Sequence, residues 1–218
     1  MKQRQLGGLI ASGTTFAILA YFAHRLPYFP QDLNISQGIQ QFNGLLPSLM
    51  YGVSMTSSFI PAAIIVALVT VWLGKSNRRL EAIILGSAAV VTALAIVPIV
   101  KSWVGRPRPA PDLVLVMATE PGESFPSGHA TFVMVFYAFI IYLLPKLIHH
   151  QAAVKIIRGL LIAFIGLTFT SRVYLGLHWA SDVLGGFFLG WLVLIVMISI
   201  YYYYLPKFSR RSENAGTS

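Results

Sequence analysis

The stretch DVLGGFFLGWLVLIVMISIYYYYL, residues 182–205, is an almost unbroken apolar run whose one charged residue, Asp182, stands at its start. A helix rises about 1.5 Å per residue, so about 20 apolar residues cross the ~30 Å hydrocarbon core of a bilayer. Lipid offers backbone groups no partner, and a helix pairs them internally. The stretch therefore predicts a transmembrane helix.

Five further apolar segments are long enough, or nearly so, to cross a bilayer: residues 6–23, 54–73, 82–100, 129–147 and 156–175. The 218-residue chain is 56% hydrophobic and 11% charged, which leaves a water-soluble globule too little polar surface. We expect an all-α integral membrane bundle of six transmembrane helices. Residues 1–218 would form a single domain, with a disordered polar tail from about residue 207.

The distribution of positive charge predicts the orientation of the bundle. Six crossings place both termini on one side, and of the 16 lysine and arginine residues only Arg25, Lys101, Arg106, Arg108 and Arg172 fall on the other. Positive loops favour the cytoplasm, so we expect cytoplasmic termini and a periplasmic or extracellular opposite face in the cell membrane. The formal charge of +9 then reflects topology, and no nucleic-acid partner is expected. Residues 27–46 are expected to form a short amphipathic helix at the outer interface.

The stretch SRVYLGLHWASD, residues 171–182, precedes the last span and carries three ionisable side chains. His178 and Asp182 are four residues apart and can touch if they share a helical turn. A carboxylate on one imidazole nitrogen leaves the other nitrogen free as a nucleophile or base. Gly186 and Gly190 continue the same spacing and indicate a face turned toward the bundle interior. The alternative is a His–Asp pair that only ties a loop.

Two other unusual stretches fall on the same side of the membrane. In PSGH, residues 126–129, Ser127 is a candidate helix N-cap and His129 lies in the first turn, where backbone N–H groups bind anions. In KSWVGRPRP, residues 101–109, Lys101 and Arg108 are held by a stiff turn, and Arg172 adds a third cation. The alternatives are an ordinary helix cap and a plain positive rim.

In order and spacing, these stretches resemble the type 2 phosphatidic acid phosphatase family, which also contains the vanadium haloperoxidases. The family pattern is K-x6-R-P, then P-S-G-H, then S-R-x5-H-x3-D. Every position is filled, by Lys101, Arg108 and Pro109, by Pro126 to His129, and by Ser171, Arg172, His178 and Asp182.

The resemblance implies a membrane lipid phosphatase that works through a phosphohistidine. His178 would be the nucleophile, Asp182 would orient it, and His129 would be the general acid. The phosphoryl group would be held by Lys101, Arg108, Ser127, Gly128 and Arg172. The substrate would be a lipid phosphate or diphosphate, such as phosphatidic acid, phosphatidylglycerol phosphate or undecaprenyl diphosphate, in contact with membrane lipids.

No metal or cofactor is expected, because three cations neutralise the phosphate and the outer acidic residues show no grouping in the sequence. Those beside the motifs, Glu120 and Glu123, are expected to be solvated loop residues; the alternative is that they tune or gate the site. Arg106 is expected to be a surface cation, with attraction of anionic lipid headgroups as the alternative, and Trp103 and Trp179 to be interface anchors. Three alternative functions remain: a lipid phosphotransferase of the same fold, a vanadate-dependent haloperoxidase, and a non-catalytic membrane binding protein. Oligomeric state is not predicted.

Overall fold

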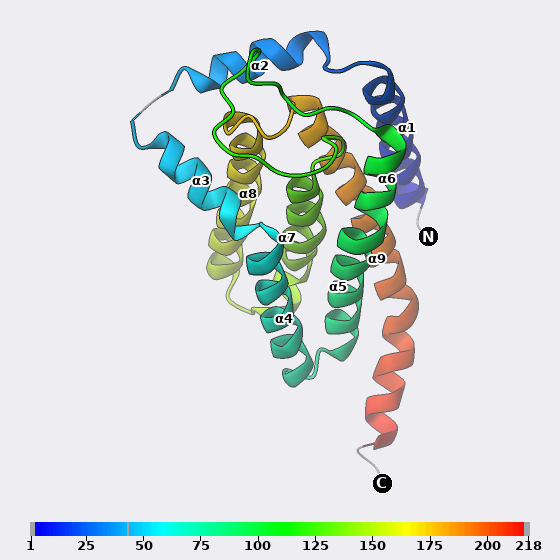
Figure 1. The fold of residues 1–218 in the computed structure, drawn as a ribbon. Helices are drawn as coiled ribbons and strands as arrows, with labels where there is room; N and C mark the ends of the chain where they lie inside the picture. The colour runs from blue at the N-terminus through cyan, green and yellow to red at the C-terminus, as the bar shows by residue number, and fades with distance from the viewer. Residues whose placement is uncertain (1–2, 43, 216–218) are drawn as a thin grey trace.

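The computed structural model describes residues 3–42 and 44–215, and within these ranges all regular structure is helical (Figure 1). The elements are α1 (Gln3–Arg25), α2 (Pro30–Gln40), α3 (Leu46–Thr56), α4 (Phe59–Lys75), α5 (Arg79–Val91), the π-helix η1 (Thr92–Ile96), α6 (Val97–Val104), α7 (Gly128–Leu147), α8 (Gln151–Tyr174) and α9 (Ala180–Ala215). The expected all-α class is confirmed.

Helix α7 lies at the centre of the bundle and packs against α5, α8 and α9 (Figure 1). Its contact with α9 depends on small residues. A Cβ at Gly190 would lie 2.5 Å from Met134 Cβ, and one at Gly186 would lie 2.7 Å from the Ser127 carbonyl oxygen. Glycine therefore allows the two helices to approach closely. The expectation that this stripe faces the bundle interior is confirmed.

Five helical segments of the described chain are long and apolar enough to span a membrane: Leu6–Arg25, Arg79–Val104, Gly128–Leu147, Gln151–Tyr174 and Ala180–Pro206. A sixth arises only if α3 and α4 are taken together, and they are bent by 54°. The predicted second span, residues 54–73, therefore contains a break. The hydroxyls of Ser57 and Ser58 donate back to carbonyls of α3 at the bend. Pro61 lies in the first turn of α4, where no helical N–H bond is lost.

The predicted third span, residues 82–100, lies within one continuous helical segment, Arg79–Val104, which contains a π-helical turn. The π-helix Thr92–Ile96 joins α5 to α6 and ends two residues before Pro98. Proline has no N–H, and its ring presses on the carbonyl one turn earlier, so a local widening relieves the clash.

The predicted amphipathic helix at residues 27–46 corresponds to α2, which crosses one end of the bundle over α8 and α9 (Figure 1). Gln40 fastens it there, because its side-chain amide donates to the carbonyls of Leu115, at 2.7 Å, and Tyr174, at 2.8 Å. Helix α2 and the loop of residues 105–127 thus cover the same end.

The polar segment from residue 207, expected to be disordered, is helical as far as Ala215. Extending an existing helix costs far less than starting one, so α9 continues beyond its apolar part. Residues 216–218 of the expected tail lie outside the described residues.

Candidate active site

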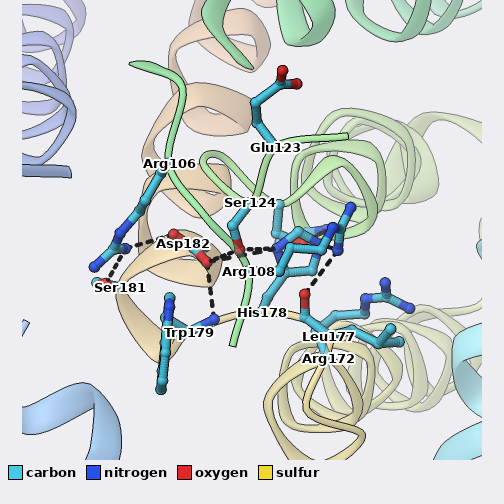
Figure 2. Close-up of polar contacts among 12 residues, drawn as sticks. Arg106, Arg108, Glu123, Ser124, Arg172, Leu177, His178, Trp179, Ser181 and Asp182 are labelled. Carbon is cyan, nitrogen blue, oxygen red and sulfur yellow. Dashed lines mark hydrogen bonds and ion pairs between the residues drawn. The ribbon is translucent and has the colours of Figure 1, made fainter. Parts of the chain in front are cut away.

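The three sequence stretches meet at the end of the bundle covered by α2 (Figure 2). Lys101 lies in the last turn of α6, which ends at Gly105 in the left-handed conformation, φ 63°. The Ser127 N–H donates to the carbonyl of Asp182 at 3.0 Å, which joins the start of α7 to the start of α9. Arg108 Nη1 lies 3.3 Å from His178 Nε2. Residues as far apart in the chain as Lys101 and Asp182 thus surround one imidazole.

Asp182 approaches His178 as predicted, but a serine lies between them. The Asp182 Oδ2 to His178 Nδ1 distance is 3.7 Å, longer than a hydrogen bond. Ser124 Oγ donates to Asp182 Oδ2 at 2.5 Å and lies 3.3 Å from His178 Nδ1. With that donation made, the hydroxyl oxygen can accept a hydrogen bond from Nδ1–H, and this tautomer has its lone pair on Nε2. Ser124 was not among the predicted site residues, although it lies three residues before the Ser127 cap.

His178 is held in its neutral form by its surroundings. Its side chain is only 1% exposed. Burial first, and then the positive charges of Arg172, Arg108 and Lys101, place the pKa of its imidazole well below the ordinary value of 6.5. A neutral imidazole at neutral pH has the lone pair that a nucleophile needs.

Arg106, expected to be a surface cation, is instead one of the most deeply buried side chains, and the expectation was wrong. It donates to Asp182 Oδ1 at 2.6 Å and to the Ser181 hydroxyl at 2.7 Å (Figure 2). It also donates to Asp32 Oδ2 at 3.0 Å. Asp32 also accepts from the Ser181 backbone N–H at 2.8 Å. Burying a carboxylate requires a partner, and Arg106 is the partner of both Asp32 and Asp182. This pairing needs α2 over the site, which no local sequence pattern shows.

Trp179 was expected to be an interface anchor and was also wrongly assigned. Its side chain is buried and packs on Tyr28, with ring centroids 5.1 Å apart. Trp103, by contrast, is 63% exposed on the outside of α6. The segment that covers Trp179 is the chain between α1 and α2, about 150 residues away in sequence.

Glu120 was expected to be a solvated loop residue, and this was wrong. Its carboxylate pairs with Arg172 and lies 3.3 Å from Arg108 Nη1 and 3.8 Å from Nε2 of both His129 and His178. Burial by itself raises the pKa of this carboxyl, but the combined attraction of Arg172, His129 and His178 outweighs it and lowers the pKa to about 2. Glu120 is therefore ionised in the site. Glu123, three residues later, points away from it (Figure 2).

The other cationic side chains also hold the loop. Lys101 Nζ donates to the Glu123 carbonyl and lies 3.4 Å from that of Ser124. Arg108 donates to the Gly122 carbonyl at 3.0 Å and to the Leu177 carbonyl at 2.8 Å. These bonds fix the cations close to the site.

At the start of α7, Ser127 caps the helix as expected, since its side chain accepts from the Ala130 N–H at 3.5 Å. His129 lies in the first turn, and its Nε2 is buried without a hydrogen-bond partner. A Cβ added at Gly128 would lie 3.7 Å from the Val97 side chain, which is an ordinary van der Waals contact, so close packing does not require a glycine at this position. The structure brings together the eight predicted site residues, Lys101, Arg108, Ser127, Gly128, His129, Arg172, His178 and Asp182, at one end of the bundle.

The family model described as PAP2 superfamily matches residues 81–206, which include all of these positions. The chain therefore belongs to the PAP2 superfamily, and the resemblance seen in the sequence is confirmed.

Two proteins similar to this chain carry related names. Over 105 residues the chain is 40% identical to phosphatidylglycerophosphatase B of Bacillus subtilis (strain 168). That match covers 45% of this chain and 48% of the relative, so it spans about half of the relative's length. The crystal structure of the first transmembrane PAP2 type phosphatidylglycerolphosphate phosphatase from Bacillus subtilis aligns with a TM-score of 0.71 at 25% identity. This alignment covers 89% of this chain and 96% of that one, which supports a multi-pass membrane protein.

Proposed function

We propose that this protein is a membrane lipid phosphatase that removes the terminal phosphate of a lipid phosphate or diphosphate through a phosphohistidine on His178. One observation carries the proposal. The Nδ1 side of His178 faces Ser124 and Asp182, while its Nε2 faces Arg108 at 3.3 Å. A neutral imidazole oriented on one side and open to cations on the other is suited to attack a phosphate.

In the first step, His178 Nε2 forms a bond to phosphorus as the bond from phosphorus to the leaving oxygen breaks. His129 gives its proton to that oxygen, so the lipid alcohol, or the lipid monophosphate from a diphosphate, leaves with that oxygen protonated. Proton transfer of this kind contributes about 10²- to 10⁴-fold. The positive charge that develops on His178 is stabilised through Ser124 by Asp182.

In the second step, water attacks the phosphohistidine. His129, now neutral, takes a proton from the water, and the bond between Nε2 and phosphorus breaks to release inorganic phosphate. Lys101, Arg108 and Arg172, with the Ser127 hydroxyl and the Gly128 N–H, would hold the phosphoryl oxygens. Phosphoryl transfer spreads negative charge over these oxygens, so fixed positive donors supply most of the catalysis.

The proposed substrate is a lipid whose tail stays in the bilayer while its headgroup reaches the end of the bundle. Both relatives are named for phosphatidylglycerophosphate, which makes that lipid the first to test. We also propose that the site faces the periplasmic or extracellular side and both termini the cytoplasm, on the positive-charge distribution. A fluorescent reporter after Ser218 and labelling of a tag near Asp112 would test this, and reversed labelling would overturn the orientation.

The proposed activity is tested with protein purified in detergent and a panel of lipid phosphates in the presence of a chelator. Phosphate release is expected to be chelator-resistant, inhibited by vanadate and abolished in His178→Ala. Acid-labile, base-stable labelling by a ³²P-substrate is expected in the wild type and absent from the variant, since phosphohistidine has that stability. Full turnover in His178→Ala would rule out the nucleophile, and transfer of label to a second lipid in place of release would indicate a phosphotransferase.

A further inference from the structure

The carboxylate of Glu120 lies among the groups to which the proposed mechanism assigns the substrate phosphate. It is paired with Arg172, 3.3 Å from Arg108, and 3.8 Å from the Nε2 atoms of the proposed general acid and nucleophile, His129 and His178. The two carboxylate oxygens of Glu120 face two guanidinium groups and two imidazoles. They therefore occupy part of the position that the oxygens of a bound phosphoryl group would take.

Donors that Glu120 does not use point to a larger anion. Within the described chain, the buried Nε of Arg172 and the buried Nε2 of His129 have no hydrogen-bond partner. A carboxylate offers two oxygens, whereas a terminal phosphate offers three. A buried donor without a partner costs free energy. A tetrahedral anion bound here could accept hydrogen bonds from these donors as well as from those that Glu120 uses.

Glu120 belongs to a segment that is fastened at its two ends. Before it, the Met117 N–H donates to the Leu175 carbonyl at 3.0 Å. After it, the Ser124 N–H donates to the Arg106 carbonyl at 2.8 Å. Between them lies Gly122, whose φ of 76° falls in the left-handed region open to glycine. Arg108 and Lys101 also bond to the Gly122 and Glu123 carbonyls, so the backbone of the loop is held. The Glu120 carboxylate can therefore leave by rotation of its own side chain, while the catalytic groups stay on the helix ends.

The carboxylate and a substrate phosphate cannot share this position, because both need the same guanidinium donors and their negative charges repel each other. Binding of substrate is therefore an exchange of one anion for another. The measured affinity is the intrinsic affinity multiplied by the fraction of molecules in which the carboxylate has left.

We propose that Glu120 is an internal competitor for the phosphoryl site, which a substrate phosphate must displace and which selects for dianionic terminal phosphates. The inference rests on the proposed function, which identifies this position as the site of the substrate phosphoryl group. A terminal phosphate carries nearly two charges at neutral pH and outcompetes a carboxylate for two guanidinium groups. A phosphodiester carries one charge and gains little by the exchange, so ordinary membrane phospholipids are excluded.

The test compares Glu120→Gln with Glu123→Gln, which removes the same charge from the same loop but from a side chain that points away from the site (Figure 2). Glutamine keeps the size of the side chain and can still accept from Arg172. Inorganic phosphate, and dimethyl phosphate as a monoanionic probe, are titrated against the thermal midpoint of each full-length protein, a measurement that needs no turnover. KM and kcat for phosphatidylglycerophosphate are measured in parallel.

Glu120→Gln is expected to bind phosphate about tenfold more tightly than wild type, since a hydrogen bond to a charged group is worth about one order of magnitude or more. It is also expected to gain measurable dimethyl phosphate binding, and to lower KM with kcat changed less than about threefold. Glu123→Gln should stay within about twofold of wild type throughout. Glu120→Ala, which removes the carboxylate altogether, should move phosphate binding in the same direction.

Equal or weaker phosphate binding in Glu120→Gln would overturn the proposal. A fall in kcat with unchanged KM would also overturn it, because Glu120 would then act in the chemical step. A wild-type protein that binds phosphate but hydrolyses no lipid phosphate would refute the proposed function, while the binding comparison would still decide whether Glu120 competes for the site.

Discussion

Replacing Arg106 by glutamine is expected to impair the site indirectly. Arg106 holds Asp182 and does not itself contact the proposed substrate. The guanidinium, whose side chain is 0% exposed, is 2.6 Å from Asp182 and 3.0 Å from Asp32. Glutamine leaves both carboxylates buried without a charged partner, held only by neutral donors such as the Ser181 N–H on Asp32 and the Ser124 hydroxyl on Asp182. Asp182 must then take up a proton or turn away, and Ser124 loses the charged acceptor that orients it.

The magnitude follows from the burial of the pair. Breaking a fully buried ion pair by removing one partner costs about 3–5 kcal/mol, which lowers the melting temperature of a protein of this size by on the order of 10 °C. A hydrogen bond to a charged group is worth about 1.5–3 kcal/mol, so kcat is expected to fall about 10- to 100-fold. Asp32→Asn, which leaves the pair of Arg106 with Asp182 intact, should destabilise less and keep kcat within about threefold.

The assay is a double-mutant cycle of Arg106→Gln and Asp32→Asn, followed by thermal unfolding in detergent and by phosphate release. The two changes are expected to be less than additive in stability by more than about 1 kcal/mol, because the double variant leaves no unpaired charge on that side. Strict additivity would refute the pairing. An Arg106→Gln protein with wild-type melting and wild-type kcat would refute the whole account of how Asp182 is held.

Three further predictions concern neighbouring features. Ser124→Ala breaks the bridge between Asp182 and His178 and should lower kcat about 10-fold or more with little change in KM, whereas an unchanged kcat would show that Asp182 acts directly. Gly190→Leu forces a side chain into Met134 and should destabilise the protein by more than about 1–3 kcal/mol, seen as a lower melting temperature, while wild-type melting would contradict the close packing. Because the folded state lowers the pKa of His178 below 6.5, the unfolded chain takes up that proton first. His178 should therefore lower the free energy of unfolding as pH falls from about 6.5 toward the pKa that this imidazole has in the folded state. An NMR titration of the His178 signal, assigned with His178→Ala, should show no midpoint near 6.5.

Much of the site could be read from the chain because its residues lie at helix ends. Local spacing places His178 one turn before Asp182, and a serine before an apolar run predicts the cap at Ser127. The glycines at 186 and 190 indicate the inward face of α9 by the same helical repeat. These features depend on helix geometry alone, which sequence pattern reports well.

The errors all concern residues whose partners come from elsewhere in the fold. A charge in a loop favours solvent unless something covers it, so Arg106 and Glu120 were expected at the surface, and Trp179 at the interface. Their actual partners are Asp32 on α2, Arg172 at the end of α8, and Tyr28 before α2.

The sequence by itself determined the membrane class, the helical spans and the residues able to carry the chemistry, because hydrophobic length and helical spacing are local properties. The tertiary structure decided which charges are buried. Helix α2 and the loop of residues 105–127 fold over one end of the bundle and bury Arg106, Asp32 and Asp182, and a buried charge is stable only beside its opposite. The pairing of Arg106 with two carboxylates, and of Glu120 with the cations of the site, follows from that covering.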